Sequence, residues 1–293
     1  MTSHRKWLPF VYLAPVLVIL VLFVYYPIFS NVYYSFFDWG SFSNTMHFTG
    51  LSNFINLFKD SVFFTALKNN IYYAIISEII LVGGGLVLAA ILEDKLVRRY
   101  ATFLRTIYFL PVLISITVIA LLFEFFYNPQ TGLLNKLLES IGLDGLTRAW
   151  LGNGDTAIFA VIAMSQWQSL GYVAMLFIIS IQKIPSELYE AARIDGAGKV
   201  KQFFHITVPQ VKEMAFVATI MTLTQAFTVF NEPYILTGGG PGHSSEVLTT
   251  YLYHSAFNED AMGYASAIAT VILAITLIIS VVQLKVFRSG EGD

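Results

Sequence analysis

The chain contains no cysteine and few charged residues, and both shortages limit what it can be. Without cysteine it can form neither a disulfide nor a thiolate metal site. Asp, Glu, Lys and Arg make up only 12% of its 293 residues, against 56% hydrophobic residues. A soluble domain of this length could not cover so much apolar surface with so few charges, so we expect an integral membrane protein.

Charge and histidine content argue against two further classes of function. The net charge of −2 offers no strong basic patch for nucleic acid. The histidines lack the paired spacing of metal ligands, because they are scattered at His4, His47, His205, His243 and His254. We therefore expect neither nucleic acid nor a bound metal.

Long apolar stretches dominate the sequence. A helix needs about 20 mainly apolar residues to cross the hydrocarbon layer. Six stretches meet this requirement, near residues 9–36, 70–92, 103–127, 156–181, 211–232 and 262–287. The first is too long for a signal peptide and has no clear small-residue cleavage site, so we expect it to be retained, with possible bends at Pro15 and Pro27. The sequence predicts an all-α membrane protein with six transmembrane helices in a single domain, residues 1–293.

The distribution of Lys and Arg predicts the orientation, because positive residues are retained on the cytoplasmic side. With six helices and both termini inside, the cytoplasmic segments hold 13 of the 17 Lys and Arg residues. These are Arg5, Lys6, Lys95, Arg98, Arg99, Arg105, Lys183, Arg193, Lys199, Lys201, Lys212, Lys285 and Arg288. The outer loops hold only Lys59, Lys68, Lys136 and Arg148. We therefore expect cytoplasmic termini and a cytoplasmic loop at residues 183–209.

This loop is polar, although it lies between two apolar stretches. Ser186 is placed to cap a helix that runs through residues 190–195, and Gly196 can end that helix in the left-handed conformation. A second apolar stripe follows, formed by Val200, Phe203 and Phe204. The pattern predicts a short helix, a turn and a second short helix, a form suited to docking on another protein. The alternative is an amphipathic helix that lies at the membrane interface.

The loop also carries a spaced motif. Glu190-Ala191-Ala192 is followed after three residues by Gly196, and after nine more by Ile206 and then by Pro209. This pattern resembles the signature loop of the membrane subunits of binding-protein-dependent ABC importers. Val208 stands where Leu is usual, which is a mild apolar exchange.

Other segments resemble the carbohydrate branch of that family, the maltose-type and glycerol-phosphate-type permeases. They are Ile184-Pro185-Ser186-Glu187-Leu188-Tyr189, Asp195-Gly196-Ala197-Gly198, Leu236-Thr237-Gly238-Gly239-Gly240-Pro241, Arg105-Thr106-Ile107 and Leu110-Pro111. The resemblance spans most of the chain. It implies the type I ABC importer permease fold.

The resemblance also implies a coupling helix between helices 4 and 5, which sits in a groove of a partner ATPase. The residues assigned to this coupling are Glu190, Ala191, Ala192, Asp195, Gly196, Ile206 and Pro209. Pro209 would begin the fifth membrane helix, where its missing amide hydrogen does least harm. The implied partners are a related permease in a heterodimer, two cytoplasmic ATPase subunits and an extracytoplasmic sugar-binding protein. The implied location is a bacterial or archaeal plasma membrane.

ATP is expected on the partner and not on this chain. Gly196-Ala197-Gly198-Lys199 suggests a phosphate-binding loop, but Arg193 stands where that motif needs Gly, and Val200 where it needs Ser or Thr. We therefore expect this chain to bind no cofactor and catalyse no reaction, with ATP and Mg on the separate ATPase.

Polar and aromatic residues within the apolar stretches are the candidates for the translocation path, because an unpaired polar group in lipid is costly. Aromatic rings stack on sugar faces, and amides and hydroxyls bind sugar hydroxyls, so the mixture suits a carbohydrate. The candidates are Ser115, Trp167, Gln168, Leu170, Gly171, Tyr172, Phe227, Thr228, Phe230 and Asn231. For any one of them, interhelical hydrogen bonding or an interfacial aromatic belt is an alternative. The lack of Lys or Arg at a clear midplane position favours a neutral saccharide over glycerol phosphate.

Two other functions are alternatives to a sugar permease that works by alternating access. An ion-coupled secondary transporter of a small polar solute would favour inverted repeats and an ion-coupling set. Glu78, in the second stretch, is thin support for it, and a structural hydrogen bond explains that residue equally well. An intramembrane enzyme would need a motif such as HExxH or GxSxG, or a facing pair of acids, and the sequence has none of these.

Overall fold

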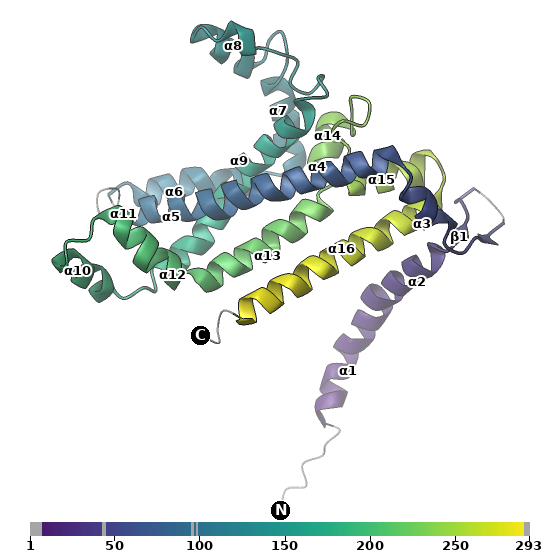
Figure 1. The fold of residues 1–293 in the computed structure, drawn as a ribbon, viewed down its shortest axis with the longest axis horizontal. Coiled ribbons are helices and arrows are strands. Elements are labelled where there is room, and N and C mark those ends of the chain that lie inside the picture. The colour runs from purple at the N-terminus through teal and green to yellow at the C-terminus, as the bar shows by residue number, and fades with distance from the viewer. Residues whose placement is uncertain (1–7, 43–44, 95–96, 98, 290–293) are drawn as a thin grey trace, which may run out of the picture. The chain divides into compact units, whose positions relative to one another are not determined.

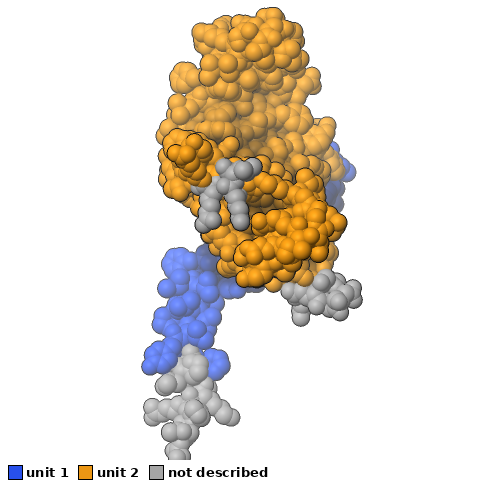
Figure 2. Space-filling model, turned by 90° about the vertical axis from the view of Figure 1, so that its left-hand side faces the viewer, with its two compact units in different colours: residues 1–60, 252–274 blue, residues 61–251, 275–293 orange. Residues whose placement is uncertain are grey.

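The computed structural model describes residues 8–42, 45–94, 97 and 99–289, and most of them are helical (Figure 1). Arg5, Lys6, Lys95 and Arg98, which contribute to the charge bias, lie outside the described residues, as does His4. The chain divides into two compact units (Figure 2). Unit 1 comprises residues 1–60 and 252–274, and unit 2 comprises residues 61–251 and 275–293. The predicted single domain stays a prediction.

Unit 1 begins with a long apolar helix and continues with a short strand pair. Its elements are α1 (Leu8–Leu20), η1 (Val21–Tyr25), α2 (Tyr26–Tyr34), β1 (Phe37–Asp38), β2 (His47–Phe48), α3 (Ser52–Leu57), η6 (His254–Asn258) and the first part of α16 (Met262–Ser289). The strands pair antiparallel, with Phe37 opposite Phe48. The wider π-helical turn η1 lies directly before Pro27, whose missing N–H leaves the preceding turn without one hydrogen bond.

Unit 2 contains the remaining elements, together with the second part of α16. They are α4 (Ser61–Ser77), η2 (Glu78–Gly84), α5 (Gly85–Glu93), α6 (Ala101–Phe109), η3 (Leu110–Leu113), α7 (Ile116–Phe126), α8 (Leu133–Ser140), η4 (Asp144–Leu146), α9 (Ala157–Ile181), α10 (Ser186–Ile194), α11 (Lys199–Gln202), η5 (Phe203–Thr207), α12 (Val208–Gln210), α13 (Lys212–Thr228), α14 (Asn231–Thr237) and most of α15 (Leu248–Tyr253).

The described helices provide up to six membrane crossings. Four are long and apolar enough by themselves, and two more arise if each of two bent helix pairs counts as one crossing. The four are Tyr12–Tyr34, Ser61–Glu93, Ala157–Ile181 and Met262–Phe287. The expected all-α fold with six crossings is confirmed, although the second crossing starts at Ser61 and not near residue 70.

The third crossing is not the single helix that the sequence predicts over 103–127. Its two parts, Ala101–Leu113 and Ile116–Phe126, meet at an angle of 99°. Pro111 cannot donate a backbone hydrogen bond, and Ile114 and Ser115 then adopt extended conformations with ψ of 138° and 134°. These two extended residues end one helix and redirect the chain into the next.

The fifth crossing is also broken, where one helix over 211–232 is predicted. Helices α13 and α14 meet at 41°, because Val229 is extended with ψ of 130° and Phe230 also leaves the helical region. The helix resumes at Asn231 and continues to Thr237, beyond the predicted end.

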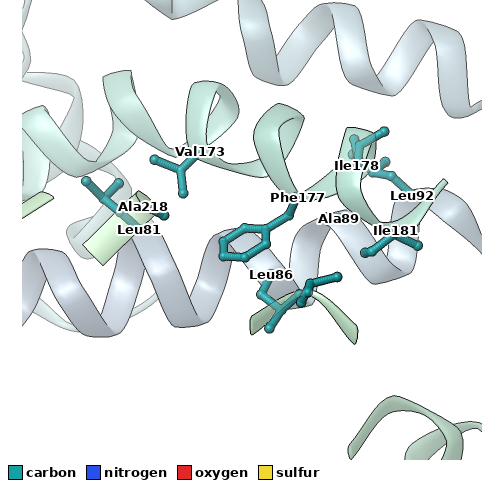
Figure 3. Packing of buried hydrophobic residues seen from close by; sticks show 10 residues of the cluster. Leu81, Leu86, Ala89, Leu92, Val173, Phe177, Ile178, Ile181 and Ala218 are labelled. Atoms are coloured by element: carbon teal, nitrogen blue, oxygen red, sulfur yellow. The ribbon is translucent and has the colours of Figure 1, made fainter. Parts of the chain in front are cut away.

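A buried hydrophobic cluster holds α5 against α9 and the start of α13 (Figure 3). Its members are Leu81, Leu86, Ala89, Leu92, Val173, Phe177, Ile178, Ile181, Val211 and Ala218. Phe177 and Ala89 are completely buried. Small residues such as Ala89 let the two helices approach closely, and the Phe177 ring fills the space beside Leu86.

Candidate functional site

A cavity of about 530 Å³ lies within unit 2, beside both helix breaks. It is lined by Leu81, Val112, Ile116, Gln168, Ser169, Tyr172, Val173, Leu176, Ala218, Met221, Thr222, Gln225, Thr228, Val229, Phe230, Asn231 and Glu232. The volume falls in the range typical of small-molecule sites.

The two breaks explain why the cavity lies at this position. Val112 and Ile116 flank the first break, and Val229 and Phe230 form the second. Non-helical backbone at membrane depth is tolerated where it is buried in protein or borders a watery space, because its polar groups then find partners. At the first break the side-chain amide of Gln168 donates to the Ile114 carbonyl at 3.2 Å.

The lining combines polar groups with aromatic rings. Hydroxyls and amides come from Gln168, Ser169, Thr222, Gln225, Thr228 and Asn231, and among the described residues the one carboxylate comes from Glu232. The rings are those of Tyr172 and Phe230, and Phe230 stacks on Tyr234 with ring centroids 4.9 Å apart. Within the described part of the chain, no Lys, Arg or His lines the cavity.

Half of the predicted path residues lie in this cavity wall: Gln168, Tyr172, Thr228, Phe230 and Asn231. The structure therefore brings together residues of α9 with residues on both sides of the break between α13 and α14.

The other half do not line the cavity. Ser115 lies at the first break, and Trp167 packs against Phe123 with ring centroids 5.3 Å apart. Leu170 packs on the hydrophobic cluster, and Phe227 is buried. Gly171 packs so closely on the Tyr108 carbonyl that a Cβ atom there would overlap it.

Sequence reasoning left Ser169 and Thr222 out of the path, although a signal was available for both. Thr222 precedes Gln225 by three residues, and Ser169 precedes Tyr172 by three residues, so each shares a helix face with another residue of the cavity wall.

The polar loop after α9 has the predicted form of two short helices around a turn. Gly196 has φ of +78°, and the Gly196 and Ala197 amides donate to the carbonyls of Arg193 and Ala192 at 3.1 and 2.8 Å. This is the Schellman arrangement that satisfies the last carbonyls of a helix, here α10. The predicted cap at Ser186 is wrong, since Ser186 is the first residue of α10 and the structure shows no side-chain cap there.

Several of the coupling residues lie on an accessible surface of this loop. Glu190, Ala191, Asp195, Gly196 and Pro209 are exposed, and Ala192 and Ile206 are partly buried. The loop also exposes large apolar side chains, with Ile194 88%, Val200 72% and Phe204 60% exposed.

Pro209 does not begin the fifth membrane helix. It lies in the short helix α12, which ends at Gln210 and is followed by Val211 with ψ of 10°. Helix α13 starts at Lys212, so the proline precedes the membrane helix by one short turn.

Hydrogen bonds and apolar contacts fix the loop to the rest of unit 2. The Lys199 ammonium lies 2.7 Å from a carboxylate oxygen of Asp94, directly after α5. Within the loop, the Tyr189 and Thr207 hydroxyls are 2.9 Å apart. Directly before the loop, Gln182 donates to Glu93 at 3.2 Å, and Glu93 also forms an ion pair with Arg105. Ile184, Phe203 and Val208 of the loop pack against the hydrophobic cluster.

The same cluster extends to the cavity. Leu81, Val173 and Ala218 belong both to the cluster and to the cavity wall. One continuous set of packed side chains therefore joins the loop to the cavity.

Glu78 lies outside the cavity wall. Its carboxylate accepts a hydrogen bond from the Thr219 hydroxyl of α13 at 2.5 Å. This contact joins two neighbouring helices, as the structural explanation of Glu78 requires.

Comparison with known proteins gives consistent matches along the chain. The family described as "Binding-protein-dependent transport system inner membrane component" matches residues 82–288. The chain is 66% identical to the probable ABC transporter permease protein YurN of Bacillus subtilis (strain 168), with all of both chains covered. It is 32% identical to the arabinooligosaccharides transport system permease protein AraP of the same organism, covering 99% of this chain and 91% of AraP.

A solved structure matches over nearly the full length. It is a chain of a bacterial ABC transporter involved in the import of the acidic polysaccharide alginate, with a TM-score of 0.83 and 25% sequence identity. The match covers 97% of this chain and 96% of that chain.

Proposed function

We propose a role in sugar uptake from one premise: this chain belongs to the family of binding-protein-dependent transport system inner membrane components, and it is a permease subunit of an ABC importer. It is a multi-pass membrane protein and a transport subunit, not an enzyme. The finer assignments of path, coupling loop and partners are proposals that follow from it.

The cavity at the helix breaks forms this subunit's half of the translocation path. Its mixture of amides, hydroxyls and two aromatic rings suits a saccharide, which presents hydroxyls at its edge and apolar C–H groups on its faces. Broken helices that line a site at membrane depth are a common device of transporters.

The loop from Lys183 to Pro209 couples ATP hydrolysis to this cavity. Its exposed side chains, including Glu190, Ala191 and Ile194, meet the ATPase, and Gly196 sets the turn that presents them. The observation that carries the proposal is the shared packing: the cluster that holds Ile184, Phe203 and Val208 also supplies three residues of the cavity wall. Because such packed interiors resist compression, a displacement of the loop also displaces the cavity wall.

The assembly contains four further subunits. A related permease completes the path in a heterodimer, two ATPase subunits bind ATP and Mg, and an extracytoplasmic binding protein delivers the sugar. The membrane is a bacterial or archaeal plasma membrane, with both termini and the coupling loop in the cytoplasm. The relatives are named for arabinooligosaccharides and alginate, which supports a saccharide cargo for this chain.

Uptake by the reconstituted complex tests this function. Proteoliposomes that contain both permeases and the ATPases should take up labelled saccharide only when the binding protein outside and ATP inside are both present. Uptake driven by an ion gradient without ATP would refute the proposal.

Crosslinking tests the coupling loop separately. The chain has no native cysteine, so Ala192→Cys gives a single reactive site without further changes. It should crosslink to the ATPase in a manner that depends on ATP. Ser140→Cys on α8, which we place on the outer side, is the matched control and should give no such product. If only Ser140→Cys gave a crosslink to the ATPase, the chain would have the opposite orientation in the membrane.

A further inference from the structure

One charged group in the cavity wall has no charged partner. Glu232 is the second residue of α14, directly after the helix break, and it is only 8% exposed although it lines the cavity. Among the described residues, its one hydrogen bond with another side chain comes from the Ser165 hydroxyl at 3.5 Å, the outer limit of such a bond. The ion pairs found in the described chain do not include it.

The surroundings of Glu232 do not supply a positive charge. Apart from Glu232, the polar lining in the described chain consists of amides and hydroxyls. A carboxylate at membrane depth that has no charged partner and only a long side-chain hydrogen bond is strongly disfavoured, so such a residue normally serves a ligand or an ion path. Glu78 differs in two respects, since the hydrogen bond that it accepts from Thr219 is short, at 2.5 Å, and since it does not line the cavity.

We propose that Glu232 selects saccharides that carry a protonated amine, such as an amino sugar or a sugar–amine conjugate, over neutral and anionic saccharides. This inference rests on the proposed function and replaces the expectation of a neutral saccharide. The Tyr172 and Phe230 rings face the apolar side of the sugar, the amides of Gln168 and Gln225 bind hydroxyls, and the Glu232 carboxylate binds the ammonium group.

Three disaccharides with the same β-1,4-linked glucose skeleton isolate the charge. They are the glucosamine dimer, which carries protonated amines, cellobiose, which carries hydroxyls, and cellobiouronic acid, which carries a carboxylate. Equilibrium dialysis against the purified permease–ATPase complex, without the binding protein and below the pKa of the amine, measures binding to the permease cavity itself. The wild-type complex should bind the glucosamine dimer about tenfold more tightly than cellobiose, and cellobiouronic acid most weakly.

Variants assign the preference to Glu232. Glu232→Gln, which keeps the shape of the side chain, should bind the glucosamine dimer and cellobiose equally. Glu124→Gln removes an exposed carboxylate of α7 outside the cavity wall and should leave the preference unchanged. Gln225→Glu adds a second carboxylate to the same wall and should increase the preference, which keeps the test decisive if Glu232→Gln does not assemble.

The inference is overturned if the wild-type complex binds the glucosamine dimer no better than cellobiose, or if Glu232→Gln keeps the preference. It is also overturned if Gln225→Glu fails to increase it. The proposed function is tested independently by ATP-dependent uptake with the binding protein. If uptake occurs but the charge preference is absent, only the proposed role of Glu232 is refuted. If no ATP-dependent uptake occurs, the proposed function itself is refuted.

Discussion

Replacing Gly171 with alanine should destabilise the permease through the packing of α9 on α6. A Cβ atom at this position would overlap the carbonyl oxygen of Tyr108 and lie 3.0 Å from the Phe109 nitrogen. Both atoms belong to the backbone at the end of α6, so no side-chain rotation can relieve the contact. One of the two helices has to move.

The magnitude follows from the cost of inserting one methyl group into a tightly packed contact, typically about 1–3 kcal/mol. The higher helix propensity of alanine returns at most about 1 kcal/mol of this. A loss of 1 kcal/mol lowers the unfolding midpoint of a chain of this size by about 2–4 °C. We therefore expect Gly171→Ala to lower the unfolding midpoint of the purified complex by several degrees.

Gly83→Ala is the matched control, because Gly83 also lies in a helix and a Cβ atom there has no neighbour within 4 Å. It should leave the unfolding midpoint unchanged or slightly raised. Thermal unfolding is followed by intrinsic fluorescence, and sugar uptake is measured in parallel. If Gly171→Ala abolished sugar uptake without lowering the midpoint, Gly171 would act as a sugar contact and the packing argument would be refuted.

Three further predictions concern the loop and the buried contacts. Gly196→Val should lower the ATPase activity that the binding protein stimulates, because valine at φ of +78° costs about 1–3 kcal/mol and disturbs the turn. Unchanged stimulation would exclude a role of this turn in coupling. Lys199→Asp should also lower the stimulation of ATPase activity by the binding protein, and the double variant Lys199→Asp with Asp94→Lys should restore it, because the reversed pair regains its attraction. If the double variant is not restored, Lys199 acts through a contact other than Asp94. Glu78→Gln should keep sugar uptake, whereas Glu78→Leu should lower the yield of folded protein in detergent, because only glutamine retains an acceptor for the Thr219 hydroxyl. If the glutamine variant folds normally but loses sugar uptake, Glu78 is a functional acid.

The family and the membrane crossings could be predicted from the sequence, because both rest on local patterns. The spacing of Glu190, Gly196 and Pro209 identified the ABC importer permeases, which the family match confirms. Apolar length located six crossings, and the helical segments lie close to them. The turn at Gly196 was also predictable, since a glycine that ends a helix commonly adopts positive φ.

The broken helices could not be predicted in the same way. Pro111 was visible in the sequence, but a proline in a membrane helix produces either a kink or a full break, and the neighbouring helices determine which. At the second break Pro233 follows the extended Val229 by four residues, so its missing N–H frees the Val229 carbonyl, but the sequence again does not determine whether the helix kinks or breaks. The predicted path residues therefore fell on the correct helices, but only half of them reached the cavity wall.

Gly171 and Gln168 connect the packing of unit 2 to the position of the cavity. Gly171 permits the close approach of α9 to the end of α6, and Gln168, one turn earlier on α9, donates to the carbonyl freed at the following break. The close approach fixes where α6 ends, and the amide stabilises the extended residues that redirect the chain. The first break is therefore a property of the contact between α6 and α9, not of the third crossing alone. This is why substitutions on α9 that never touch the cargo can still change the shape of the cavity that receives it.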